Sequence, residues 1–169
     1  MFVICDTLHF ARGKPPGGDE GTVMLIRNIC PRCGHATEAY KNPLPTVDVI
    51  IDIDSRVVLI KRKNDPPGWA IPGGFIDYGE SAEDAARREM REETNLEISD
   101  LRQFHTYSNP DRDPRFHTVT IVYTAKSIGT PVAGDDAGEV GLFDPDDLPA
   151  PLAFDHAEIL KEYFRSRDR

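Results

Sequence analysis

Apolar and polar positions become regular only from Thr46 onward. The runs TVDVIIDI (46–53) and RVVLIKR (56–62) are rich in β-branched residues and are separated by Asp54-Ser55, which predicts a β-hairpin. The next apolar run, WAIPGGFI, predicts a short strand that Pro72-Gly73-Gly74 interrupts. Further strands are predicted at 96–107, 115–126 and 140–143.

Two segments have helical periodicity. The first begins after Ser81, which can cap the helix with Asp84 three residues later, and it ends at about Thr94. The second runs from Phe154 to about Arg165. Its expected core contacts are Phe154, Ile159, Leu160, Tyr163 and Phe164. Strands mixed with two helices predict an α/β fold, in which the helices cover both faces of a mixed sheet.

The first 45 residues follow a different pattern. They contain the turn-rich segment KPPGGDEG (14–21), the cysteine motif CPRCGH (30–35) and the proline-containing connector YKNPLP (40–45). We therefore predict an N-terminal extension at 1–45 and one domain at 46–169.

Composition and charge narrow the range of partners. The formal net charge of −9 argues against binding to nucleic acid or to an anionic membrane. The chain has no apolar run long enough to span a membrane, and its N-terminus lacks the features of a secretory signal. We therefore expect a cytoplasmic protein. Two of the three cysteines, Cys30 and Cys33, form a CxxC motif, which in such a protein indicates metal or redox chemistry.

The charges of the first helix divide into two faces. With 100° per residue, Ala86, Glu89 and Glu93 fall within about 40° of Ala82. Glu92 lies on the flank of this face, whereas the arginines at 87, 88 and 91 lie on the opposite half. A charged solvated face would usually mix the two signs, which favours a metal site. A solvated face nevertheless stays open as the second interpretation. Clustered carboxylates present the hard oxygens that Mg²⁺ or Mn²⁺ prefers.

The surrounding residues match a longer pattern. Gly74, Glu80, Arg88-Glu89-Met90, Glu92-Glu93, Asn95 and Leu96 resemble the 23-residue Nudix box of the Nudix hydrolases, with Asn95 standing where the family has glycine. Asparagine tolerates the left-handed conformation expected at the end of a helix, so the departure is mild.

The resemblance implies a Nudix-type α/β/α sandwich that hydrolyses a nucleoside diphosphate linked to another moiety, with a divalent metal as cofactor. It implies that Glu89 and Glu93 are the principal metal ligands, with Glu92 nearby and the Gly73 carbonyl as a further ligand. Arg88 and Glu80 would brace the loops around the helix. For the catalytic base, the acidic segment GDDAGEVGLF offers Glu139, Asp136 and Asp135, of which Glu139 is favoured.

The segment YSNPDRDPRFHTVTIVY (107–123) indicates the substrate. Arg112, Arg115 and His117 cluster around two prolines, and arginine suits bidentate recognition of phosphate. Arg62 is a further candidate for phosphate binding. The segment resembles the branch of the family that hydrolyses ADP-ribose to AMP and ribose 5-phosphate. An ordinary charged loop is the alternative interpretation.

The N-terminal extension resembles a second enzyme group, the NADH pyrophosphatases. CPRCGHATEAYKNP is similar to the cysteine knuckle that precedes their Nudix domain, but the SQPWPFPxS-type run and the second cysteine pair are missing. Cys5 and His9 could complete a four-ligand structural Zn²⁺ site with Cys30 and Cys33, and His35 is another candidate ligand. A knuckle that holds no metal is the alternative, which would make the extension a zinc-ribbon remnant.

Three other functions stay open at this point. The substrate of an enzyme could be a dinucleotide such as NADH, or a nucleoside triphosphate. A Nudix fold can also serve as a ligand-sensing module without catalysis. A homodimer is raised by analogy with ADP-ribose-cleaving relatives.

Overall fold

The computed structural model describes residues 25–134 and 137–167. Its backbone contacts divide the chain between Asn42 and Pro43 into two compact units. Cys5 and His9, Asp135 and Asp136 lie outside the described residues. Within the two described ranges, no helix is long and apolar enough to span a membrane.

The described part of the first unit is an antiparallel hairpin of β1 (Leu25–Ile29) and β2 (Ala36–Tyr40). In the turn between them, the Cys30 amide donates to the His35 carbonyl at 2.9 Å, and the Gly34 amide donates to the Cys30 carbonyl at 2.9 Å. Hydrogen bonds from the backbone N–H groups of Arg32 and Cys33 lower the pKa of the half-buried Cys30 thiol. The turn thus favours the thiolate form of Cys30.

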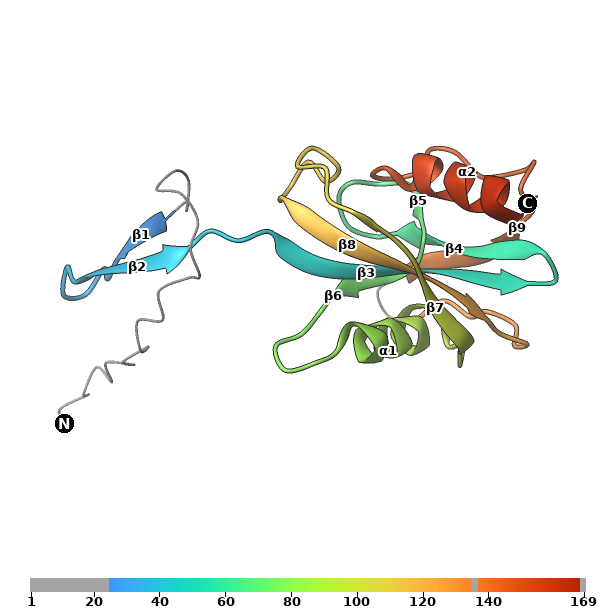
Figure 1. Cartoon of the computed structure of the whole chain (residues 1–169), viewed down its shortest axis with the longest axis horizontal. Coiled ribbons are helices and arrows are strands. Elements are labelled where there is room, and N and C mark those ends of the chain that lie inside the picture. Colours follow the sequence, from blue (N-terminus) through green and yellow to red (C-terminus); the bar gives the residue numbers. More distant parts are fainter. Residues whose placement is uncertain (1–24, 135–136, 168–169) are drawn as a thin grey trace. The chain divides into compact units, whose positions relative to one another are not determined.

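The second unit contains a seven-stranded mixed sheet (Figure 1). Its main path runs β5-β4-β3-β8-β7, with β6 paired to β3 and β9 paired to β4. Its strands are β3 (Leu44–Ile53), β4 (Arg56–Arg62), β5 (Trp69–Ala70), β6 (Gly73–Phe75), β7 (Ser99–Tyr107), β8 (Thr118–Lys126) and β9 (Ala137–Phe143).

Strand β3 is the centre of this sheet. It runs parallel to β8 from the pair Leu44–Thr118 to the pair Asp52–Lys126 and antiparallel to β6. The predicted hairpin with β4 is present, although only Asp52 and Ile53 of β3 pair with β4. The two strands then separate, because β6 takes the place beside β3 and β9 pairs with β4.

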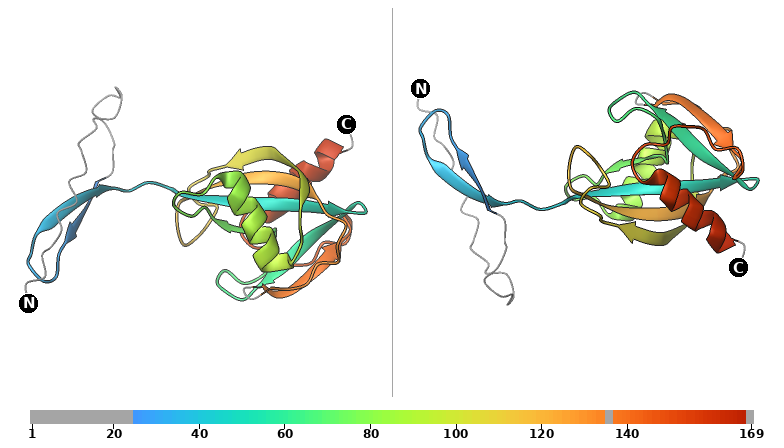
Figure 2. Two further views of the ribbon diagram at one scale, coloured as in Figure 1. Left: turned by 90° about the horizontal axis from the view of Figure 1, so that it is seen from below. Right: turned by 90° about the horizontal axis from the view of Figure 1, so that it is seen from above.

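The two helices lie on opposite faces of the sheet, as Figures 1 and 2 show. Helix α1 (Ala82–Thr94) packs its buried Ala85, Ala86 and Met90 against one face. Helix α2 (His156–Arg167) packs Ile159, Leu160 and Tyr163 against the other. Successive residues of β3 point to opposite faces of the sheet, so Val49 packs in the core under α1 and Ile50 packs in the core under α2. The predicted α/β/α sandwich is confirmed.

The helix boundaries follow from their caps. The Ser81 side chain accepts a hydrogen bond from the Asp84 amide at 3.1 Å, and Asn95 ends α1 in the left-handed conformation with φ 54°. Both features match the prediction for this helix. Phe154 was expected in the core of the second helix. It lies before α2 instead, packs on a small cluster of Ile60, Ala70 and Ala153, and lines a cavity.

Candidate functional site

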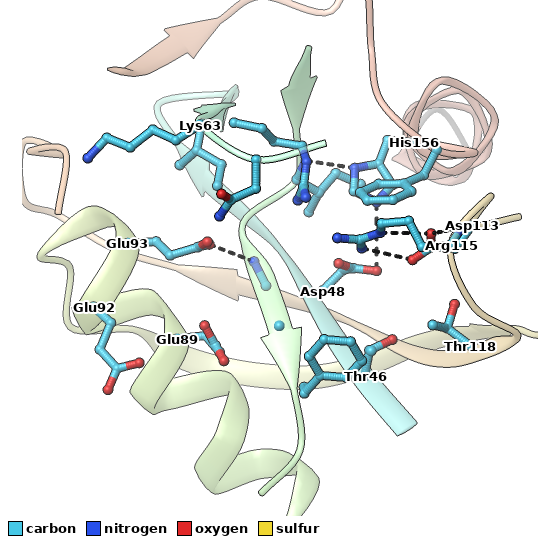
Figure 3. Close-up of a pocket in the computed structure, with 18 of the residues that line it drawn as sticks. Thr46, Asp48, Lys63, Glu89, Glu92, Glu93, Asp113, Arg115, Thr118 and His156 are labelled. Carbon is cyan, nitrogen blue, oxygen red and sulfur yellow. Dashed lines mark hydrogen bonds and ion pairs between the residues drawn. The ribbon is translucent and has the colours of Figure 1, made fainter. Parts of the chain in front are cut away.

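One cavity of about 430 Å³ lies between the two helices, at one edge of the sheet (Figure 3). Residues of β3, β4, β6, α1, the loop before β8 and the start of α2 line it. Two groups of side chains face each other across this space. We call Glu89, Glu92 and Glu93 of α1 the carboxylate wall, and Arg62, Arg112 and Arg115 the arginine wall.

The carboxylate wall is a consequence of how α1 packs. Because Ala85, Ala86 and Met90 are buried against the sheet, the neighbouring positions of the helix turn their glutamates toward the cavity (Figure 3). Glu93 is only 9% exposed, and its Oε2 accepts a hydrogen bond from the Gly73 amide at 2.8 Å. Glu92 is the exposed member, with 58% of its side chain accessible.

Burial sets the protonation of this wall. It raises the pKa of Glu93 to about 8, against the effect of the Gly73 amide, and the nearby charges of Glu89 and Asp48 add to the rise. Burial is also the main reason that the pKa of Glu89 is raised. Without a cation, burial thus favours the neutral form of Glu93 at neutral pH, and a positive charge placed beside it would favour the carboxylate.

Arg88 braces the carboxylate wall from the side. Its guanidinium donates to both carboxylate oxygens of Glu80, at 3.0 and 2.9 Å, and to the Phe75 carbonyl at 3.0 Å. It also donates to Glu89 at 2.7 Å and to Glu92 at 3.0 Å. The predicted contact between Arg88 and Glu80 is present. Asp84, one turn before Arg88, accepts a hydrogen bond from the Ser81 hydroxyl.

The residues present suit a divalent cation in chemistry. A side chain at Gly73 would collide with the Val47 carbonyl, so this position requires glycine, and one at Gly74 would displace the Glu89 carboxylate. In residues 25–134 and 137–167 no three His, Cys, Asp or Glu side chains converge closely enough to hold a metal ion. Arg88 supplies the positive charge between Glu89 and Glu92 in this arrangement. Carboxylate oxygens are the hard donors that Mg²⁺ prefers.

The arginines of the arginine wall differ in whether a carboxylate neutralises their charge. Arg112 is buried and forms a bidentate pair with Asp155, at 3.0 and 2.7 Å, while it also donates to Thr118. Arg115 forms a bidentate pair with Asp113, at 3.0 and 2.9 Å.

Arg62 is held in a different way from these two arginines. Its guanidinium donates to two main-chain carbonyls, those of Pro66 at 2.9 Å and Asp65 at 3.2 Å. Within the described ranges no carboxylate forms an ion pair with it. Arg62 is thus the arginine of this wall whose charge is available to an anionic ligand.

Sequence reasoning missed a buried polar network behind the cavity. Asp48 accepts a hydrogen bond from Thr120 at 2.7 Å, and burial raises its pKa to about 6. His156 Nδ1 accepts from the Ile71 amide at 2.9 Å, so its proton lies on Nε2, which is 3.8 Å from Asp48. Burial lowers the pKa of His156 to about 3, so the ring is neutral. The sequence feature that could have indicated this network is Asp48, a carboxylate between two valines in a mostly apolar strand.

Two candidate residues lie away from the cavity. His117 is exposed and outside the lining, and its main-chain carbonyl accepts from the Leu44 amide. Glu139 of β9 is also outside the lining, in an exposed ion pair with Lys61 at 3.6 Å. Cys30 and Cys33 lie in the first unit, in the turn between β1 and β2.

A short segment completes the C-terminal end of α1. The Val132 amide donates to the Thr94 carbonyl at 2.9 Å, and the Gly134 amide donates to the Glu93 carbonyl at 3.0 Å. The Asn95 side chain donates to the Val132 carbonyl at 3.1 Å. A side chain at Gly134 would collide with the Glu92 carbonyl. The segment thus satisfies carbonyl groups that the helix leaves open, in the turn that carries Glu92 and Glu93.

Comparison with known proteins agrees with this geometry. The NUDIX domain model matches residues 42–163. An ADP-ribose pyrophosphatase of Methanocaldococcus jannaschii is 47% identical over 129 residues, which are 75% of this chain and 76% of that protein. The ADPR responsive transcriptional repressor NtrR of Acinetobacter baylyi is 33% identical, over 74% of this chain and 54% of the repressor. The chain thus spans about half the length of that second relative.

A solved structure extends the comparison. The NUDIX domain of Shewanella oneidensis NrtR, complexed with ADP ribose, is 31% identical with a TM-score of 0.67, over 76% of this chain and 90% of that domain. The match to the family model covers well over half of the chain and includes α1, the main sheet and most of α2. This protein belongs to the Nudix family.

Proposed function

We propose that this protein hydrolyses the diphosphate of ADP-ribose and releases AMP and ribose 5-phosphate. The main observation in support is that the carboxylate wall and the arginine wall face each other across one cavity of about 430 Å³. Such a cavity suits a ligand with a diphosphate between two polar groups. The 47% identity with an ADP-ribose pyrophosphatase supports the choice of substrate.

The carboxylate wall would hold the metal. Glu89, Glu92 and Glu93 supply carboxylate oxygens, and the Gly73 carbonyl is the further proposed ligand. A bound Mg²⁺ or Mn²⁺ would neutralise the diphosphate and activate the attacking water. Arg88 would keep the three glutamates oriented through its contacts with Glu80, Glu89 and Glu92.

The arginine wall would bind the diphosphate. Arg62 offers a half-buried charge that donates to two main-chain carbonyls, and Arg115 lies beside it. Arg112 already donates hydrogen bonds to Asp155 and Thr118, so its proposed role is to position the other residues of the wall. His117, from its exposed position, would reach only a part of the ligand that extends out of the cavity.

Two glutamates compete for the role of catalytic base. Glu139 would have to leave Lys61 to reach the cavity, whereas Glu92 already lines it and is 58% exposed. Glu139→Gln separates the two proposals. If Glu139 is the base, this variant should lower kcat by about 100-fold or more, at high pH as well as at neutral pH, because general base catalysis contributes about 10²–10⁴-fold. If Glu92 is the base, Glu139→Gln should lower kcat far less; Glu92→Gln should lower it in either case, because Glu92 is also a proposed metal ligand.

The test of the proposed function is a substrate panel with Mg²⁺ or Mn²⁺. It comprises ADP-ribose, NADH, nucleoside triphosphates and dinucleoside polyphosphates, with products identified by mass. Fastest turnover of ADP-ribose to AMP and ribose 5-phosphate supports the proposal. Faster turnover of NADH would favour the dinucleotide alternative instead. ADP-ribose binding without turnover of any compound, with metal present, would favour a sensing module.

A structural zinc ion is a separate proposal for the first unit. Cys30 and Cys33 supply two thiols on one turn, and Cys5 and His9 are the further proposed ligands. Metal analysis of protein purified without chelator should find about one zinc per chain, and Cys33→Ser should release it. Absence of zinc would overturn this proposal. The proposed homodimer is checked on the same sample by light scattering.

A further inference from the structure

The ring of Phe154 lies between the arginine wall and the small core cluster. The guanidinium carbon of Arg62 is 4.7 Å from the ring centroid, and that of Arg115 is 5.3 Å from it. Phe154 lines the cavity and lies two residues before the start of α2, with φ 56°. Its ring therefore contacts both arginines that we assign to phosphate binding.

The two arginines need such a contact, because their charges repel each other. Desolvation and the charge of Arg115 both lower the pKa of Arg62, so each guanidinium disfavours the other. Both donate to the same acceptor, the Asp65 carbonyl, at 3.2 Å from Arg62 and 3.0 Å from Arg115. A carbonyl dipole and the negative face of an aromatic ring are the groups that hold them together.

We infer that Phe154 is a positioning residue for substrate binding, which keeps Arg62 and Arg115 side by side and directed toward the diphosphate. The inference rests on the proposed function, and it adds a residue that does not itself bind phosphate. It also explains why a large apolar residue lines a polar cavity beside two cations. The alternative is that Phe154 only fills the core beside Ile60 and Ala153.

The two roles predict different substitutions. Methionine fills a similar volume but has no aromatic face, whereas tyrosine keeps the ring. If the ring positions the arginines, Phe154→Met should raise KM for ADP-ribose about tenfold, with kcat within about twofold, because two cation–π contacts are lost. Phe154→Tyr should stay within about twofold of the wild type in both constants. Equal effects of the two variants, or no change of KM in Phe154→Met, would overturn the inference.

A matched control comes from α2 itself. Phe164→Met makes the same chemical change in a partly buried ring that packs on the core under α2, outside the cavity lining. It should leave KM unchanged. In an Arg62→Ala/Arg115→Ala background, adding Phe154→Met should raise KM no further, since the residue acts through the arginines. A further tenfold rise would contradict that route.

A binding measurement separates this inference from the proposed function. Calorimetry with inorganic pyrophosphate, in the presence of a chelator, reports on the arginine wall without any turnover. Wild type and Phe154→Tyr should bind equally, and Phe154→Met should bind about tenfold more weakly. Equal pyrophosphate binding by all three variants would overturn the role of Phe154 even if ADP-ribose is hydrolysed. If ADP-ribose is not hydrolysed but binding differs as expected, only the proposed function fails.

Discussion

The two walls of the cavity differ in how their charge is compensated. In the carboxylate wall, Glu93 and Glu89 are desolvated together, and the single guanidinium of Arg88 braces Glu89 and Glu92 from one side. In the arginine wall, Arg112 and Arg115 each have a bidentate carboxylate partner. Burial therefore disfavours the ionised form of the glutamates in one wall, whereas the charge of the other wall is nearly neutralised except at Arg62.

This difference assigns different tasks to the two walls. A site with desolvated carboxylates gains most from a cation, so the carboxylate wall suits metal binding and the chemical step. A wall that is already paired loses little flexibility when a ligand binds, so it suits orientation of the substrate. The account thus expects the carboxylate wall to control kcat and the arginine wall to control KM.

The largest expected effect is on folding, and it lies in the arginine wall. Arg112→Met leaves Asp155 and the buried Asp48 without their guanidinium. Removing one partner of a buried ion pair typically costs about 3–5 kcal/mol in the free energy of unfolding. Urea denaturation measures it. Arg91→Met, which breaks an exposed pair with Glu97, should cost less than about 1 kcal/mol. Equal losses in the two variants would refute a structural role for Arg112.

The next effect is on catalysis, in the carboxylate wall. Glu93→Gln should lower kcat for ADP-ribose at least ~100-fold through lost metal positioning, without unfolding the protein. Glu97→Gln is the control, because Glu97 follows the helix and is 81% exposed. Circular dichroism checks the fold of both variants. Near-normal activity of Glu93→Gln would remove it from the proposed ligands.

A smaller effect is expected behind the carboxylate wall. Gly134→Ala places a methyl group against the Glu92 carbonyl and should cost about 1–3 kcal/mol in the free energy of unfolding. Gly129→Ala meets only the flexible end of Leu96 and should change the free energy by about 0.5 kcal/mol or less. Thermal denaturation of both variants tests whether the 132–134 segment supports the last turn of α1.

The smallest effect is a pH dependence of stability that comes from His156. Its pKa is lowered by burial from 6.5 to about 3, so between these values the unfolded chain binds one proton more than the folded protein. Stability from this group is therefore full above pH 6.5 and is lost as the pH falls. Between pH 6 and 5, wild type should lose about 1 kcal/mol more than His156→Gln. Parallel pH profiles of the two proteins would contradict the neutral buried ring.

How much of this the sequence predicted depends on the range of the interactions. Helix α1, its caps and its glutamate face follow from spacing within 15 residues, and the structure has them as predicted. The pairing of Arg88 with Glu80 was expected from the resemblance to the Nudix box, and the structure has it. The α/β/α layers followed from the order of strands and helices.

The arginine wall could not be predicted to the same degree, because its contacts are distant in sequence. Arg112 pairs with Asp155 over 43 positions, and the Ile71 amide bonds His156 over 85 positions. The pattern indicated arginines suited to phosphate but not that Arg112 is already neutralised. Nor did it indicate that Phe154, expected in the core, lies beside Arg62.

The most direct test of the two-wall account compares Glu93→Gln and Arg62→Ala in one ADP-ribose assay with Mg²⁺. The account predicts that Glu93→Gln lowers kcat at least ~100-fold with KM changed only a few fold, and that Arg62→Ala raises KM about tenfold or more with kcat nearly unchanged. If both variants change the same kinetic constant to a similar extent, the division of tasks between the two walls is wrong.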